Sequence, residues 1–499
     1  MTQALVKSRK AQTKPARTAS KTETSEKKSS SPSSLTVNSW EDDPESGVQL
    51  TTPVPDLTKT PLAFTFPTPA PKPDAYPPGT SQFRYWAAAA ALRRGADYWA
   101  KRVPLKRWQA GSSLKVILDL GEDLNAYYNR AALVFFHGPS PTGTVYSGES
   151  PDVACHELGH AVLDAFKPEL WGAASQEVAA FHEAFGDISA IMSAIQLPSL
   201  RNTILTATGG RLYQNSRLSR LAEQLGNAIR ASEPGSVDPD CLRNAVNSFT
   251  YQDPVTLPSR APAAQLSSEP HSFSRLFTGA FFEILGTCLA AKAAKPKQPT
   301  EQELLSVGND LAGFLVEAVK SSSVVANWYA QVAAAMVVAA GSDAVYTSRI
   351  KGVFVRRGIL SLHSAASLPD VARVATLAAV PKAAPTVESL PTIGLAATHY
   401  GIDGMLFVEA AVQPRSYLVT SAATDATPAS PPSGSAAAVS FVDDLFTRGR
   451  IDYGDVVLEK YRLGDGGRLK THALVKVDGG ARLQRRLFDC GLCAAGLDH

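Results

Sequence analysis

The chain has 499 residues, 44% of them hydrophobic, which is enough for two or three domains with a substantial core. Its formal net charge is only +3, so no overall field favours nucleic acid as a partner. Five cysteines in a chain of this length do not form a disulfide framework. The CGLC segment, with Cys490 and Cys493, has no second cysteine pair or nearby histidine that would indicate zinc, and it is assigned no function.

Residues 1–78 are predicted to be a disordered basic and proline-rich tail and linker. Residues 1–30 are rich in lysine and arginine and almost free of aromatic or branched apolar side chains, so they cannot bury enough surface to fold. Residues 48–78 are strewn with proline, which is typical of an extended linker. No apolar run of signal-peptide length follows the first charges, which predicts a cytoplasmic location or export by a non-classical route.

Residues 79–355 are predicted to form an α+β catalytic domain. Helical periodicity begins at Gln82, and apolar strand-like segments follow over residues 113–138. A helix should begin at Pro151, because Ser150 can cap it and Asp152 favours the positive end of its dipole. The remaining expectations are a second helix at about 176–195, an irregular stretch over 196–270, and helices near 275–293, 301–320 and 323–341.

The most apolar stretch, residues 324–341, is marginal in length for a membrane span and dominated by alanine, so we expect a buried core helix and no membrane span. Residues 356–499 are predicted to form a separate C-terminal domain of unknown role. This domain has strand-like pieces on both sides of a Pro/Ser/Ala linker at about 421–438.

The segment DVACHELGH places His156 and His160 one helical turn apart, so both imidazoles can reach one metal ion. Glu157 is rotated by about 100° from His156, which places it beside the open position of the metal, where it could take a proton from bound water. Two imidazoles, a carboxylate and a vacant fourth position are typical of catalytic zinc. The motif alone arises by chance in roughly one such sequence in a hundred, so its flanks decide.

The third ligand has to come from the following helix, because no third histidine follows in HELGHAVLDAF. Glu183 and Asp187 share a helical face with small residues, which would let the two helices approach closely. We expect Glu183 to bind the metal and Asp187 to accept the N–H of a ligand histidine. Glu177 is the competing candidate for the third ligand.

SPDVACHELGHAVLDAF followed by HEAFGDI resembles the thermolysin family of zinc endopeptidases, a gluzincin family whose pattern is HExxH and then ExxxD. Three further segments resemble family segments in the right order, and the resemblance covers about residues 82–345. These segments are NAYYN (125–129), CLRN (241–244) and PHSFSRLFTGAFF (270–282). The resemblance implies a thermolysin-like fold with an N-terminal β-rich lobe, a central HExxH helix and a C-terminal helical lobe.

The resemblance also implies a role for each matching residue at the metal. His156, His160 and Glu183 would bind Zn²⁺, Glu157 would be the general base, and Asp187 would orient His156.

Further roles concern the substrate. His271 would hydrogen-bond the oxyanion as a catalytic residue, Arg243 would bind a substrate carbonyl, and the edge strand at Asn125 and Ala126 would pair with the substrate backbone.

The sequence departs from the family pattern at several positions. The loop between His160 and Glu183, which contains Trp171, is a few residues longer, and no tyrosine for the oxyanion can be placed in it. Leu266 stands where an acid should support the later histidine, with Glu269 as a substitute. Ca²⁺ is doubtful: Asp152 matches one ligand, but Ala194 replaces a second carboxylate.

The sequence therefore predicts a zinc-dependent endopeptidase that hydrolyses a peptide or protein substrate through zinc-bound water activated by Glu157. The alternative is a catalytically weak or inactive zinc-binding relative that acts as a peptide- or protein-binding module. Intact Glu157 favours the enzyme, because a purely structural zinc site closes its fourth position and needs no base.

Overall fold

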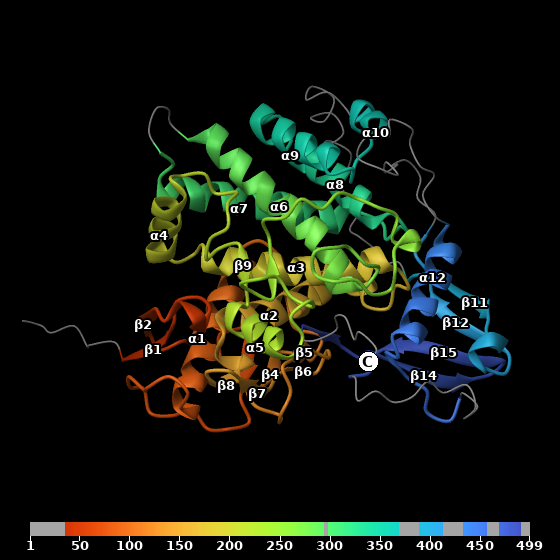
Figure 1. Ribbon diagram of the computed structural model, residues 1–499, viewed down its shortest axis with the longest axis horizontal. Coiled ribbons are helices and arrows are strands. Elements are labelled where there is room, and N and C mark those ends of the chain that lie inside the picture. The colour runs from red at the N-terminus through yellow and green to blue at the C-terminus, as the bar shows by residue number, and fades with distance from the viewer. Residues whose placement is uncertain (1–34, 294–297, 369–388, 413–432, 457–468, 491–499) are drawn as a thin grey trace, which may run out of the picture.

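The computed structural model describes residues 35–293, 298–368, 389–412, 433–456 and 469–490, and its architecture is α+β (Figure 1). The helices are α1 (Ser81–Ala100), α2 (Pro151–Phe166), α3 (Gln176–Ala194), α4 (Pro198–Thr208), α5 (Glu223–Ser232), α6 (Pro270–Lys292), α7 (Glu301–Ser321), α8 (Trp328–Ala339), α9 (Ala344–Arg356), α10 (Leu362–Ser367) and α12 (Gly434–Thr447). The strands are β1 (Thr36–Trp40), β2 (Gln49–Pro53), β3 (Ala63–Thr65), β4 (Ser113–Ile117), β5 (Ala126–Tyr128), β6 (Ala132–Phe135), β7 (His137–Ser140), β8 (Gly143–Tyr146), β9 (Arg220–Leu221), β10 (Arg243–Asn244), β11 (Thr392–Ala396), β12 (Met405–Glu409), β13 (Ile451–Asp452), β14 (His472–Val477), β15 (Gly480–Arg485) and β16 (Phe488–Asp489).

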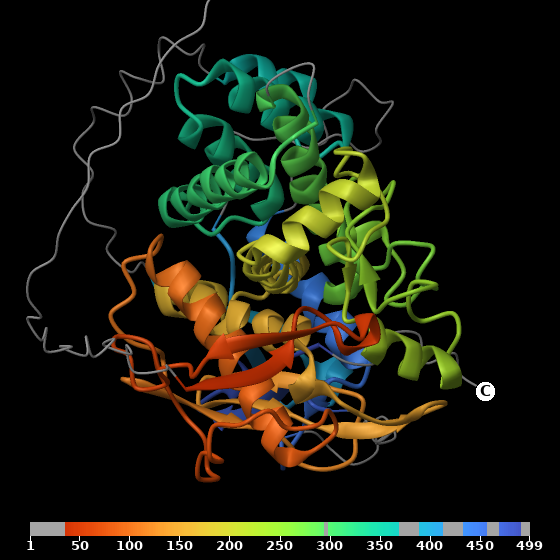
Figure 2. The same cartoon turned by 90° about the vertical axis from the view of Figure 1, so that its left-hand side faces the viewer.

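Helices α2 and α3 cross the middle of the molecule (Figures 1 and 2). Every residue of α3 is buried, and α1, α2 and α6 pack around it. A helix covered on all sides is apolar around its whole circumference, and α3 has mainly alanine, phenylalanine and isoleucine outside its acids. Helices α6 to α9 lie on one side of this pair, and the strands of the N-terminal half lie on the other (Figure 2).

The sheet next to α2 has the strand order β16-β5-β6-β4-β3. Strand β4 is parallel to both of its neighbours, β3 and β6. Strand β5 is antiparallel to β6, with Tyr127 opposite Val134. The strand that completes the sheet, β16, comes from the C-terminal end of the described chain and is antiparallel to β5. A second sheet, in the order β11-β12-β15-β14-β13, packs with α12 at the other end of the molecule (Figure 1).

The prediction of a disordered segment over residues 1–78 is wrong for its second half. Residues 36–40 and 49–53 form the antiparallel pair β1–β2, and residues 63–65 join the main sheet beside β4. Apolar side chains anchor this segment between its prolines: Trp40 meets Phe83 of α1 edge to face at 5.2 Å, and Phe64 is buried. Residues 1–34 lie outside the described part of the chain.

Two other regions differ from the predictions. Residues 196–270 contain α4 and α5, which were expected to be irregular. The predicted linker at about 421–438 overlaps the start of α12, because Ser433 caps this helix and the alanines after it are good helix formers. The earlier part of that linker lies outside the described residues.

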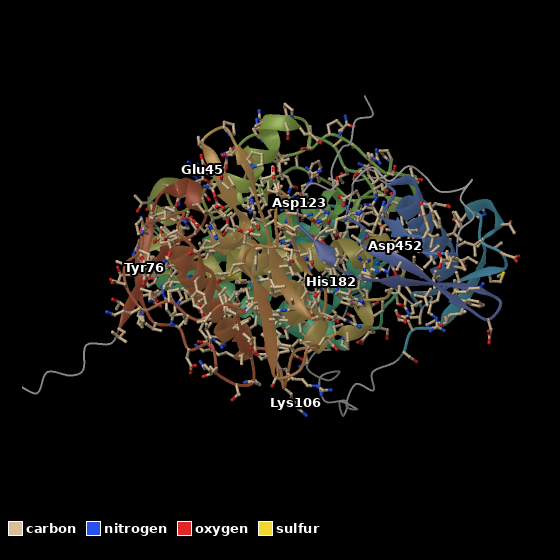
Figure 3. The ribbon with its side chains drawn as sticks, turned by 90° about the horizontal axis from the view of Figure 1, so that it is seen from below. Glu45, Tyr76, Lys106, Asp123, His182 and Asp452 are labelled. Atoms are coloured by element: carbon tan, nitrogen blue, oxygen red, sulfur yellow. The ribbon has the colours of Figure 1, made fainter. Side chains whose placement is uncertain are left out.

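The C-terminal region contacts the part of the chain that was predicted to be the catalytic domain at two places. Strand β16 belongs to the sheet next to α2, and the loop between α2 and α3 pairs with β12, where the Ala174 N–H donates to the Glu409 carbonyl at 2.8 Å. The C-terminal region therefore meets the rest of the chain both through β16 and through the loop between α2 and α3, and its strands lie beside His182 of α3 in the view from below (Figure 3).

One described helix, α6, is long and apolar enough to cross a membrane, but 83% of its most apolar window is buried inside the protein. The pair α3 and α4 passes the same test only if two helices bent by 100° are taken as one span. The described residues therefore contain no clear membrane span, and α8, within the predicted apolar stretch, is a buried core helix.

Candidate metal centre and peptide groove

The HExxH helix, α2, begins as its sequence predicts. Ser150 caps it by accepting a hydrogen bond from the Val153 N–H, and Pro151 is its first residue. His156, Glu157 and His160 are all buried on this helix, and their ligand atoms lie within 4.8 Å of one another. Local sequence thus places two imidazoles and one carboxylate in one position that could hold a cation.

Glu183 of α3 completes this cluster. Its Oε2 lies 3.2 Å from His156 Nε2, and its Oε1 lies 3.7 Å from His160 Nε2. Burial alone would raise the pKa of Glu183, but the imidazoles of His271 and His160 lower it well below its usual range. The carboxylate is therefore ionised between two histidines, which is the form that binds a metal.

The competing candidate, Glu177, lies elsewhere on α3. It accepts hydrogen bonds from the Tyr251 hydroxyl and the Tyr329 backbone N–H, each at 2.7 Å. Burial raises the pKa of Glu177 to about 7. Glu177 serves the packing between α3 and α8, and the structure brings Glu183 to the histidines instead.

Asp187 lies one turn after Glu183 and contacts the other nitrogen of the same histidine. The distance from Asp187 Oδ1 to His156 Nδ1 is 3.0 Å, and Arg243 Nη2 donates to the same oxygen at 2.9 Å. Burial raises the pKa of Asp187, but Arg243 and His156 together lower it to about 2. A charged carboxylate on Nδ1 turns Nε2 of His156 toward Glu183, which is the orienting role expected of Asp187.

Several polar groups in the cluster are left without hydrogen bonds. Among the described residues, neither nitrogen of His160 and neither oxygen of Glu157 has a hydrogen-bond partner, although both side chains are fully buried. Burial lowers the pKa of His160 to about 3 and raises that of Glu157 to about 8. Buried polar groups without hydrogen bonds lower the stability of the folded protein, and a bound cation would supply a partner for the His160 imidazole. The donor set of two imidazoles and a carboxylate fits Zn²⁺.

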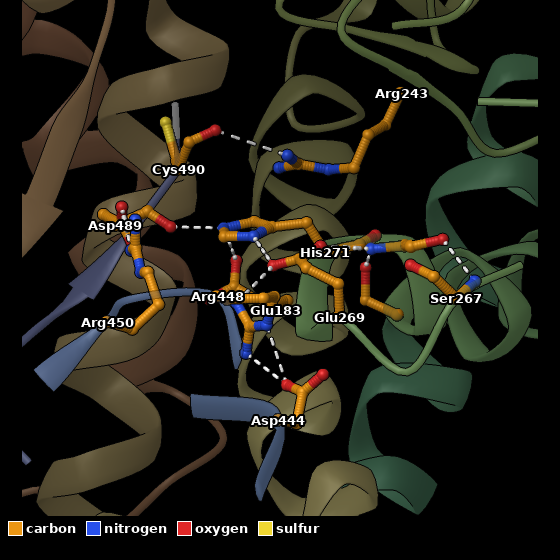
Figure 4. Close-up of polar contacts among 12 residues, drawn as sticks. Glu183, Arg243, Ser267, Glu269, His271, Asp444, Arg448, Arg450, Asp489 and Cys490 are labelled. Carbon is orange, nitrogen blue, oxygen red and sulfur yellow. Dashed lines mark hydrogen bonds and ion pairs between the residues drawn. The ribbon is translucent and has the colours of Figure 1, made fainter. Parts of the chain in front are cut away.

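His271 reaches the same cluster from the first turn of α6 (Figure 4). Its Nε2 lies 3.2 Å from Glu183 Oε2, and its Nδ1 lies 2.7 Å from Glu269 Oε1. Glu269 therefore supplies the supporting acid that is missing at Leu266. The position of Glu269 is fixed because it is also the N-cap of α6, accepting from the Ser272 N–H at 2.9 Å.

The edge strand proposed to pair with substrate is already paired. Ala126 begins β5, and its carbonyl accepts a hydrogen bond from the Cys490 N–H at 3.0 Å. The side chain of Asn125 is buried and accepts from the Ala126 N–H at 2.9 Å. Arg243 Nη1 lies 3.5 Å from the Cys490 carbonyl oxygen. Ala126 and Arg243, two of the residues expected to bind a peptide, thus contact Cys490 of the same chain.

Sequence reasoning missed the residues that occupy the groove, which is the site between the edge of β5 and the candidate metal ligands. Phe488 stacks on His182, with ring centroids 4.1 Å apart, and on His160 at 5.0 Å. Arg485 donates to the Trp171 carbonyl at 2.9 Å, so the long loop between α2 and α3 serves as a docking surface for the C-terminal sheet. The unusual length of that loop was the available signal, but nothing local in the sequence connects it to residue 488.

Asp152 does not meet a second carboxylate at residue 194. It lies instead near Asp43, and burial followed by the Asp43 charge raises its pKa well above the usual range. Its Oδ2 accepts from the Ala222 N–H at 3.2 Å. Asp152 is therefore hydrogen-bonded to the Ala222 backbone and lies close to Asp43 of the N-terminal segment.

No protein family model matches this chain, and no curated protein matches it by sequence.

Proposed function

We propose that the protein is a zinc-dependent endopeptidase of the thermolysin-like gluzincin type. One observation carries the proposal: Glu183 reaches both His156 and His160, with the general-base candidate Glu157 in the same cluster. The order of the motifs along the chain, which resembles that family, supports the same reading.

A Zn²⁺ ion held by these three ligands would polarise a peptide carbonyl and lower the pKa of a water molecule toward about 7. Glu157 would accept the proton of the attacking water at its carboxylate and pass it to the leaving nitrogen. His271 would donate a hydrogen bond from Nε2 to the developing oxyanion, an interaction typically worth about 3 kcal/mol in the transition state. Ala126 and Arg243 would hold the peptide backbone along β5.

The test is zinc content and peptide hydrolysis measured on the same preparation. The wild-type protein is expected to carry one Zn²⁺ per chain and to hydrolyse casein, with the activity abolished by phenanthroline. Glu157→Gln should keep its zinc and lose at least roughly 100-fold in kcat, as is typical when a general base is removed. Unchanged hydrolysis by Glu157→Gln would eliminate the mechanism.

A second candidate function is a zinc-stabilised module that binds peptides without cleaving them. The pairing of β16 with β5 favours it, because the groove is occupied by the protein's own chain. Tightly bound zinc with no turnover of casein or of a peptide library would support this candidate, whereas zinc-dependent turnover would exclude it.

A further inference from the structure

The last described residues lie in the groove as a peptide ligand would. Strand β16 runs antiparallel to β5, with Phe488 opposite Tyr128 and Asp489 opposite Tyr127. The Cys490 N–H then extends the pairing to the Ala126 carbonyl. Addition of a strand to a free sheet edge is a common way to bind an extended peptide, because backbone hydrogen bonds supply affinity for any sequence.

Two successive carbonyl groups of this segment meet the residues proposed to act on a substrate. The Asp489 carbonyl oxygen accepts a hydrogen bond from His271 Nε2, and the next carbonyl, of Cys490, faces Arg243 (Figure 4). The same His271 nitrogen is 3.2 Å from the candidate metal ligand Glu183. The Asp489 carbonyl therefore lies next to the metal centre.

The general-base candidate lies at the other end of the same peptide bond. The Cys490 side chain is buried, and it is close enough to Glu157 for each group to influence the pKa of the other. Glu157 and His271 thus flank the bond between Asp489 and Cys490. A base on one side and a carbonyl donor on the other is the arrangement that hydrolysis of this bond requires.

Side chains on the N-terminal side of the bond hold this register. Arg450 Nη2 donates to both carboxylate oxygens of Asp489, at 2.7 and 2.6 Å, and both side chains are buried. Phe488 is covered by Arg485, whose guanidinium carbon lies 4.0 Å from the ring centroid. A slip of one residue would turn these side chains to the opposite face and break both contacts.

We propose that this segment is a substrate of its own chain, and that the bond hydrolysed is Asp489–Cys490. The inference rests on the proposed function. The oxygen of water forms a bond to the Asp489 carbonyl carbon, the C–N bond breaks, and a water proton passes through Glu157 to the Cys490 nitrogen. The products are a chain that ends in the Asp489 carboxylate and a peptide that begins at Cys490.

The experiment follows the intact mass of the full chain, purified in the presence of chelator, after one equivalent of Zn²⁺ is added. The mass should fall by residues 490–499 of the present sequence, and a peptide that begins with Cys490 should appear. Glu157→Gln should stay whole. Because the reaction is within one chain, a ten-fold dilution should leave the rate constant unchanged, whereas a ten-fold fall would overturn cleavage in the same chain.

A matched pair of variants at one position tests the register. Cys490→Ala keeps the backbone N–H that Ala126 accepts and should be cleaved like the wild type. Cys490→Pro removes that N–H and should stay whole, with thermal melting to show that it is folded. Cleavage at another bond, or equal cleavage of both variants, would overturn the assignment.

A parallel casein assay separates this inference from the proposed function. Casein hydrolysis by a chain that stays whole would overturn self-cleavage and leave the proposed function standing. If Cys490→Ala also raised the casein activity in that case, residues 488–490 would be an inhibitory segment that acts through the Cys490 thiol. A zinc-loaded chain that cleaves neither casein nor itself would overturn both proposals.

Discussion

At the scale of single residues, two glutamates on one helix have different surroundings. Glu177 and Glu183 are both fully buried on α3. Two tyrosines supply hydrogen bonds to Glu177, and burial raises its pKa, whereas three histidines surround Glu183 and lower its pKa. The difference arises because α3 presents residue 183 to α2 and residue 177 to α8.

These two glutamates form a matched pair for mutation. Glu183→Gln should weaken Zn²⁺ binding by at least roughly 10-fold to 100-fold, the loss typical even of groups outside the ligand shell. Glu177→Gln should keep its zinc, because its amide oxygen can still accept from the Tyr329 N–H while its NH2 group donates to the Tyr251 hydroxyl oxygen. Competition with a chromophoric chelator measures both affinities. Equal zinc affinity in the two variants would show that Glu183 is not a ligand.

Asp43 offers a pH-dependent test away from the metal centre. Burial raises its pKa to about 7 from an ordinary value of 3.8, opposed by hydrogen bonds from the Glu45 and Gln224 N–H groups and from Ser150. The folded protein therefore keeps a proton that the unfolded chain loses above pH 4. The contribution of Asp43 to the free energy of unfolding is therefore present in full below pH 4. It is lost as the pH rises from 4 through 7, and the total loss is roughly 4 kcal/mol at most.

Asp43→Asn cannot ionise, so it removes this dependence. Urea unfolding between pH 4 and pH 8 measures the free energy of unfolding of both proteins. This free energy should fall more steeply with rising pH in the wild type than in Asp43→Asn. A difference between the two proteins that does not change with pH would contradict the buried, protonated state of Asp43.

At the scale of elements, the metal centre depends on how closely α2 and α3 approach. A Cβ on Gly159 would lie 2.8 Å from the Cα of Gly186, and a Cβ on Gly186 would lie 2.7 Å from the His156 ring. Both distances are shorter than normal contacts, and the neighbours are backbone or a fixed ring. The two glycines therefore let the helices bring His156 and Glu183 together.

Gly186→Ala should disturb both packing and metal binding. We expect a loss of about 1–3 kcal/mol in unfolding free energy, the usual cost of overpacking, together with weaker zinc binding because the His156 ring must move. Gly313→Ala on α7 is the control, since its Cβ would meet nothing within 4 Å and should add stability as a helical alanine. Zinc titration and thermal unfolding of both variants check this; full zinc affinity in Gly186→Ala would contradict it.

The elements that the sequence predicted are those with local signals. Helix α2 has its cap, its proline and its HExxH spacing within one segment, and α3 follows as expected, so the arrangement of His156, His160 and Glu183 could be predicted. The pairing of residues 63–65 with β4 could not be predicted, because the surrounding prolines indicate a linker. The pairing of residues 488–489 with β5 could not be predicted either, because that strand has only two residues. Long-range pairing leaves little trace in a single short strand.

At the scale of the whole molecule, three distant parts of the chain meet at one place. The HExxH helix pair supplies the candidate metal ligands, α6 supplies His271, and the C-terminal region supplies the strand in the groove (Figures 1 and 4). The composition of the sequence changes after residue 355, but packing continues across that boundary, because β16 pairs with β5 and Glu409 accepts from the Ala174 N–H. The role of the C-terminal region in the groove is visible only in three dimensions.

The most direct test of the central claim is anomalous X-ray scattering from crystals of the zinc-loaded protein, measured on both sides of the zinc absorption edge. The account predicts one strong zinc peak, bound by His156 Nε2, His160 Nε2 and a Glu183 carboxylate oxygen at about 2.0–2.2 Å. A peak bound by other residues, or no peak between these three side chains at full zinc loading, would contradict it.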